Sequence, residues 1–292
     1  MWRNIFGRKY QMVVVVACGL ISDVMTAYGN EKATPATQAA TEPKAADAVT
    51  DRDREVQQLR DAIASKADDP ENIRREFQIG VLLSQRPEVQ RHPTVDMPKA
   101  LEVFEAIVAC YDHQHYYQSE ICNSLNDSQY LVPQSAILAA SIINGLNKGP
   151  EKAREYLHKA MTDLQWTYEK RKKDWVEAPK PEITPKQLMY ERKERLEDHV
   201  KRWEQHVQDG KAGKVFGSLE MCLVEAAVRQ YGLSFGPQHP DKVAAAMAEI
   251  IRDFPDTPMA EVAKKRIDAA QRVMGNTSTT RPAPRAAGKP AG

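Results

Sequence analysis

The stretch Val243–Ala263, VAAAMAEIIRDFPDTPMAEVA, decides the fold class. Its apolar residues Val243, Met247 and Ile250 stand at positions i, i+4 and i+7, which lie on one face of an α-helix. Pro255 then closes this helix, and the remainder of the stretch begins another one. The spacing therefore predicts a helical hairpin whose apolar faces pack against each other.

The same spacing recurs in two earlier segments, where a small residue comes first and lets a neighbouring helix approach closely. These sets are Ala100, Phe104 and Ile107, and Ala153, Leu157 and Ala160. We predict a first hairpin from 71–84 and 98–111, and a second from 134–146 and 150–164. A further helix is expected over 51–65. Alternating β-branched runs are missing outside the apolar N-terminal segment, so the predicted class is all-α.

The hairpins resemble tetratricopeptide repeats. Val243, Met247, Ile250 and Pro255 match the positions of the small, large, second small and closing proline residues of that repeat. Segment 254–263 is similar to exported bacterial repeat proteins that assist outer-membrane assembly and cell-envelope organisation. The unequal intervals between the three sets make the predicted repeats degenerate, as in an interrupted α-solenoid.

This resemblance implies a non-enzymatic adaptor or scaffold that binds a protein or peptide on the concave face of its hairpins. In the family, residues of the first helix of each hairpin form that face. The partner-binding residues that the resemblance implies are Arg74, Phe77, Val81, Leu138 and Ile142.

Residues 1–29 are typical of an export signal, because basic residues precede the apolar run 12–21 and no acidic residue occurs before Asp23. The run is too short to span a bilayer, which requires about 20 apolar residues. We expect cleavage after Gly29 and export, to the periplasm of a bacterial envelope. Alternatives are an uncleaved anchor and acylation of Cys18, whose surroundings resemble the lipobox of bacterial lipoproteins. Membrane contact is expected only under these alternatives.

Two low-complexity segments flank the predicted helical domain, residues 51–275. Residues 30–50 contain almost no large apolar residue, and we expect a disordered linker. Residues 276–292 combine basic residues with Pro, Ala, Gly and Thr, and we expect a disordered basic tail. The chain has 41 basic and 40 acidic residues. This balance is not that of a surface tuned to nucleic acid, so no nucleic acid partner is expected.

Residues 165–211 are predicted to form a charged helical insertion. Its basic run Lys170–Lys173 is interpreted as a solvated helix end, and the alternative is a polyanion site flanked by Tyr168 and Trp175. After three prolines, a helix is expected over 185–208, either packed on the hairpins or projecting toward a partner. The apolar stripe of that helix comprises Met189, Leu196, Val200, Trp203 and Val207.

The segment Asp112–Cys122 is the candidate for a metal site or an enzymatic function. His113 and His115 follow a carboxylate, and imidazole and carboxylate groups are common metal ligands. A third ligand is not evident, although Glu120 or Cys122 could fold back toward the histidines. The other interpretation is a solvated polar loop.

Cys110 and Cys122 are close enough in sequence to pair in an oxidising compartment, whereas Cys222 is expected to be buried in a helix. The motifs GxGxxG, P-loop, HExxH, GxSxG and CxxCH do not occur, so no cofactor is predicted and no enzymatic activity is indicated. Three hypotheses follow: an envelope adaptor, a metal-dependent protein or enzyme using the Asp112–Cys122 segment, and a purely structural envelope protein.

Overall fold

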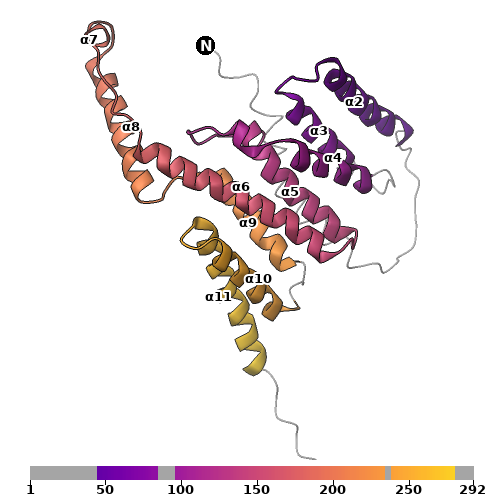
Figure 1. Ribbon diagram of the computed structural model, residues 1–292. Helices are drawn as coiled ribbons and strands as arrows, with labels where there is room; N and C mark the ends of the chain where they lie inside the picture. The colour runs from indigo at the N-terminus through magenta and orange to yellow at the C-terminus, as the bar shows by residue number, and fades with distance from the viewer. Residues whose placement is uncertain (1–44, 85–95, 234–237, 280–292) are drawn as a thin grey trace, which may run out of the picture. The chain divides into compact units, whose positions relative to one another are not determined.

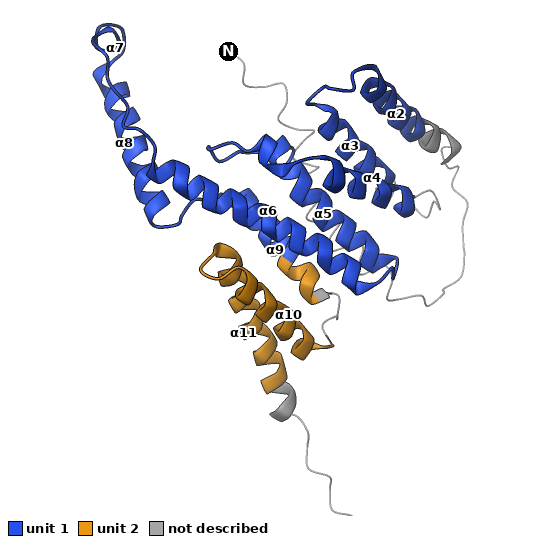
Figure 2. Cartoon of the chain, in the orientation of Figure 1, with its two compact units in different colours: residues 1–227 blue, residues 228–292 orange. Residues whose placement is uncertain are grey.

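The computed structural model describes residues 45–84, 96–233 and 238–279. Every regular element in these ranges is helical, which confirms the predicted all-α class (Figure 1). The chain divides into two compact units, Met1–Ala227 and Val228–Gly292 (Figure 2). The boundary between them falls inside α9 (Ser218–Leu233). The single helical domain predicted for 51–275 therefore contributes to both units.

The helical part extends beyond its predicted ends. α2 (Ala45–Ser65) begins within the predicted linker, because three of its first four residues are Ala, which has the highest helix propensity. α11 (Pro258–Thr279) runs into the predicted tail, since each residue added to an established helix gains a hydrogen bond. The predicted signal peptide with Cys18, and the rest of the linker and tail, lie outside the described residues.

The first predicted hairpin is formed by α3 (Asn72–Ser84) and α4 (Met97–Cys110), which pack on each other. Asp96 caps the start of α4, because its side chain accepts a hydrogen bond of 3.2 Å from the backbone N–H of Lys99. This cap satisfies one of the free N–H groups of the first turn and fixes where the second helix of the hairpin begins.

Phe104 fills the space between these two helices. Its side chain is fully buried, and its ring meets that of Phe77 edge to face with the centroids 5.8 Å apart. Gly80 faces the same ring, and a Cβ atom at this position would lie 2.7 Å from Cε1 of Phe104. The close approach of α3 to α4 therefore depends on glycine at this position.

The second hairpin consists of α5 (Ser128–Gly145) and α6 (Pro150–Val176), and α5 also packs on α4. Gly149 precedes α6 with a φ of 106°, a conformation that favours glycine. α5 begins earlier than predicted and includes Pro133, because burial of the flanking residues offsets the hydrogen bond that the proline removes. α6 does not end at Leu164 but continues to Val176, since its buried face continues as far as Trp175.

The third hairpin lies in the second unit, where α10 (Pro240–Asp253) packs on α11. Thr257 stabilises the turn between them, because its hydroxyl donates to the carbonyl of Phe254 at 2.6 Å and accepts from the N–H of Ala260 at 3.3 Å. Of the ten positions assigned to the repeats, eight are buried: Ala100, Phe104, Ile107, Ala153, Leu157, Ala160, Met247 and Ile250. Val243 is half-buried and Pro255 is exposed.

The charged insertion differs from its prediction. Instead of one helix over 185–208, the structure has α7 (Pro185–Tyr190) and α8 (Lys193–Lys211), separated where Glu191 is extended with φ −109° and ψ 148°. α7 does not pack extensively on any other described helix, so packing does not support one continuous helix across Glu191. We call residues 177–211 the arm.

The arm is attached to the hairpins through α8, which packs on α6. Leu196 is buried, and Trp203 is half-buried with its indole N–H donating to the carbonyl of Ala178 at 2.8 Å. Met189 is 78% exposed. The residues of the predicted apolar stripe that belong to α8 are therefore buried or half-buried, whereas its one residue in α7, Met189, is exposed.

Candidate functional site

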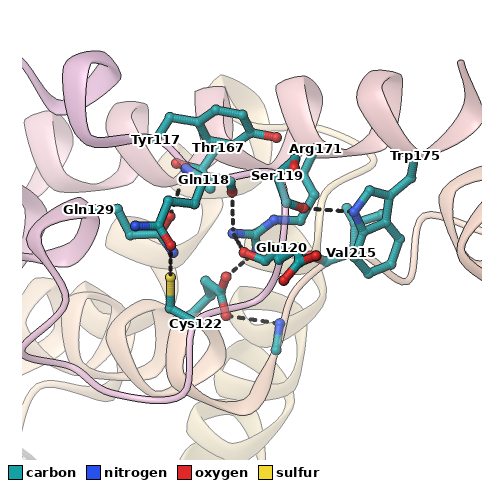
Figure 3. Close-up of polar contacts among 12 residues, drawn as sticks. Tyr117, Gln118, Ser119, Glu120, Cys122, Gln129, Thr167, Arg171, Trp175 and Val215 are labelled. Carbon is teal, nitrogen blue, oxygen red and sulfur yellow. Dashed lines mark hydrogen bonds and ion pairs between the residues drawn. The ribbon is translucent and has the colours of Figure 1, made fainter. Parts of the chain in front are cut away.

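Arg171 of α6 and Glu220 of α9 form an ion pair in the first unit, and both side chains are fully buried. One terminal nitrogen of Arg171 donates to Glu220 and to the carbonyl of Val215, the latter at 3.2 Å. The other donates to the carbonyls of Gln118 and Glu120, both at 3.3 Å (Figure 3). A single guanidinium thus joins three segments that are far apart in the sequence.

The guanidinium of Arg171 stays charged. Desolvation lowers the pKa of Arg171, but the Glu220 carboxylate beside it outweighs this effect and raises the pKa above its usual value. The second oxygen of Glu220 accepts a 2.9 Å hydrogen bond from the backbone N–H of Gly217. The neighbouring Tyr130 is buried, and both desolvation and the Glu220 charge raise its pKa, so the phenol stays neutral.

Two aromatic side chains of α6, Tyr168 and Trp175, lie near this ion pair. Trp175 donates its indole N–H to the carbonyl of Ser119 at 2.7 Å, next to the carbonyls that Arg171 holds (Figure 3). Trp175 and Tyr168 form a buried cluster with Val215. On its other side, Trp175 stacks on His206 of α8 with centroids 4.6 Å apart and planes at 12°. This packing keeps water from the buried charges, which strengthens their attraction.

The interpretation of the run Lys170–Lys173 as a solvated helix end is wrong for Arg171, whereas Lys173 is exposed in the last turn of α6 and Lys170 and Lys172 are half-buried. Arg171 in this run is fully buried, and Tyr168 and Trp175, the aromatic residues expected to flank a binding site, are buried as well. The reason is that α6 does not stop at Leu164. Residues three and four apart along a helix share one face, so the inward stripe continues and places Arg171 in the interior.

His113 is buried within η1 (His113–Tyr116) and is not part of a solvated loop. Its Nε2 lies 2.6 Å from the hydroxyl of Thr167, which itself donates to the carbonyl of Asp163 at 3.0 Å. Nε2 therefore carries the proton and donates to Thr167. His115 is exposed. Within the described ranges, no group of three or more His, Cys, Asp and Glu side chains is arranged to hold a metal ion.

Burial lowers the pKa of His113 to about 4, because its Nδ1 has no hydrogen-bond partner and a proton there would be a desolvated charge. In the unfolded chain the pKa is near 6.5. The unfolded state therefore binds more protons between these values, and stability falls as the pH falls through this window. We expect a loss of about 2 kcal/mol between pH 7 and pH 5.

Urea denaturation at both pH values measures this loss, and His113→Gln is the matched variant. The variant cannot take up the proton, so its loss of stability over the same interval should be smaller by about 2 kcal/mol. An equal pH dependence of the two proteins would show that His113 is not held neutral by burial.

The three cysteines in the described ranges are free thiols. Cys110 and Cys122 are not bonded to each other. Burial raises the pKa of Cys122 to about 11, and its thiol lies 3.0 Å from the side-chain oxygen of Gln118, to which it donates. Cys222 is exposed, contrary to the prediction. It lies two positions after Glu220, on the opposite side of α9 from the buried carboxylate.

The five residues expected to bind a partner differ in accessibility. Arg74 is exposed and donates from Nε to the hydroxyl of Ser128 at 3.2 Å, across α3 and α5. Val81 and Leu138 are half-buried on the same two helices. Phe77 and Ile142 are buried, and Phe77 packs on Phe104. The accessible members of the set are thus Arg74, Val81 and Leu138.

No protein-family model, curated protein or solved structure matches the chain. Among the described residues, no helix combines the length and apolar character needed to cross a bilayer.

The Arg171–Glu220 pair is the feature that sequence reasoning missed. Two signals pointed to it. Glu220 is the only acid within the otherwise mostly apolar segment 215–224, and Arg171 continues the spacing that begins at Ala153. Neither signal predicts that Arg171 and Glu220 form an ion pair, because the two residues lie on separate helices.

Proposed function

We propose that this protein is a non-enzymatic, exported helical adaptor or scaffold that binds a protein or peptide in a bacterial cell envelope. The observation that carries the proposal is the succession of hairpins α3–α4 and α5–α6, whose first helices leave Arg74, Val81 and Leu138 accessible. Stacked helical hairpins offer an extended surface for recognition. The basic residues and short apolar run of residues 1–29 support export.

The hydrogen bonds of the buried polar side chains also support the role of a scaffold. Arg171 donates its hydrogen bonds to Glu220 and to backbone carbonyls of the same chain. His113 donates to Thr167, and its lowered pKa leaves it uncharged. These groups hold segments of the fold in place, a role suited to a rigid surface that presents a binding face.

Site-specific photo-crosslinking tests the adaptor role. A benzophenone amino acid replaces Val81 or Leu138 in the chain expressed in its native bacterium, and Glu102 is the control because it is exposed on α4, the second helix of the same hairpin. We expect a discrete protein adduct from positions 81 and 138 and none from 102. Absence of adducts at both test positions, or identical adducts at all three, would contradict the proposal.

N-terminal sequencing of the protein recovered from those cells tests export separately. We expect a mature chain that begins near Asn30, because small residues precede the cleavage position. Recovery of intact Met1 would point to an uncleaved anchor, and a lipid-modified Cys18 would point to the lipoprotein alternative. Either result would rule out cleavage after Gly29.

A further inference from the structure

One buried side chain attaches residues 112–117, which we call the strap, to α5 and α6. His113 is 2% exposed, whereas the other five residues of the strap are exposed or half-buried. Its Nε2 lies 2.6 Å from the hydroxyl of Thr167 in the interior. At the end of the strap, Tyr117 donates its hydroxyl to the partly exposed Asp174 at 3.0 Å. The attachment of the strap therefore depends mainly on the buried position of His113.

Both ends of the strap are anchored without His113. Before it, the N–H of Tyr111 donates to the carbonyl of Ile107 at 3.1 Å, which continues the hydrogen bonding of α4. After it, Arg171 and Trp175 donate to the carbonyls of residues 118–120 (Figure 3). Segments with few buried groups open locally at a lower free energy than the whole fold. The strap can therefore detach between these anchors while the hairpins remain folded.

The groups around His113 disfavour a proton on its ring. Burial and the Lys159 charge on α6 oppose the charged form, whereas Asp112 and the backbone carbonyls of Gln129 on α5 and Asp163 on α6 favour it. The opposing effects are larger, and the pKa of His113 falls to about 4. The Asp163 carboxylate binds Lys159 at 2.6 Å, and its second oxygen has no hydrogen-bond partner. Desolvation raises the pKa of this carboxyl.

We propose that protonation of His113 releases the strap from α5 and α6 in mild acid while the hairpins stay folded. In the buried position a protonated ring is a desolvated charge whose Nδ1 has no hydrogen-bond partner, whereas the released ring is hydrated. Release uncovers Thr167 and the half-buried Trp166, whose ring meets that of His113 edge to face with centroids 6.0 Å apart. The accessible surface of α6 thus changes with pH, independently of the adaptor role.

Amide hydrogen exchange of the whole protein, followed by mass spectrometry, tests the release. The N–H groups of His115 and Tyr117 donate within the strap and report its opening, and residues 137–143 of α5 are the reference. The released state binds more protons, so we expect the protection factor of the strap to fall about 20-fold from pH 7 to pH 5. Low urea concentrations should leave strap exchange unchanged and accelerate the slower exchange of α5, because only global unfolding exposes much surface.

Two variants assign the pH dependence to His113. His113→Gln retains a donor for Thr167 but takes up no proton, so the fall in strap protection should disappear. Thr167→Val keeps the titrating ring and removes its partner, so protection should be lower at both pH values and still fall about 20-fold between them. A fall that survives His113→Gln, or one that is absent from the wild type or from Thr167→Val, would overturn the proposal. Strap exchange as slow and as sensitive to urea as that of α5 would also overturn it.

Discussion

Replacing Phe104 by Ala is expected to lower the free energy of unfolding by about 3–5 kcal/mol. The ring is fully buried between α3 and α4, packs edge to face on Phe77 and lies directly against Gly80. Its loss removes apolar burial and leaves a cavity that helices fixed at close distance cannot fill. Urea denaturation followed by circular dichroism measures the effect.

Glu102→Ala is the matched control for this prediction, because Glu102 lies on the same helix and is exposed. Surface substitutions of this kind change stability by about 0.5 kcal/mol or less. If Phe104→Ala shifts the denaturation midpoint no more than Glu102→Ala does, Phe104 does not hold the first hairpin together.

Replacing Arg171 by Met is expected to cost a similar amount, about 3–5 kcal/mol. The substitution keeps an unbranched side chain but leaves the Glu220 carboxylate buried without its counter-charge, and it frees the carbonyls of Gln118 and Glu120. Lys173→Met is the control, because Lys173 is an exposed basic residue on the same helix. Thermal and urea unfolding compare the variants.

A second variant separates the loss of an interaction from the cost of an unpaired charge. In Arg171→Met with Glu220→Gln, no buried charge remains, so much of the lost stability should return. A double variant as unstable as Arg171→Met would show that the guanidinium acts mainly through the backbone carbonyls. A single variant as stable as Lys173→Met would contradict the role of the ion pair altogether.

The hairpins could be predicted because their determinants are local. Spacings of three and four residues selected Phe104, Leu157 and Met247, all fully buried, since a helix turns by a fixed angle per residue. The same rule applied past Leu164 would have placed Arg171 on the buried face. Its charge, however, is typical of a solvent-exposed position and favours the opposite face.

The partners of the buried polar groups could not be predicted. Glu220 is 49 residues from Arg171 and Thr167 is 54 residues from His113. Each pair forms because separate helices come together, and helical spacing carries no information about which faces meet. The division at Glu191 of the helix predicted over 185–208 has a related cause, because whether a helix continues depends on what packs against it.

The way Arg171 and Trp175 hold the 118–120 segment affects how freely the sequence can change over evolution. Their acceptors there are main-chain oxygens, and the side chains of Ser119 and Glu120 are exposed. Almost any residue supplies such an oxygen, whereas few supply a forked guanidinium or an indole N–H. Substitutions in this segment can therefore leave it in place, whereas a substitution of either donor of α6 would remove its hydrogen bonds to the segment.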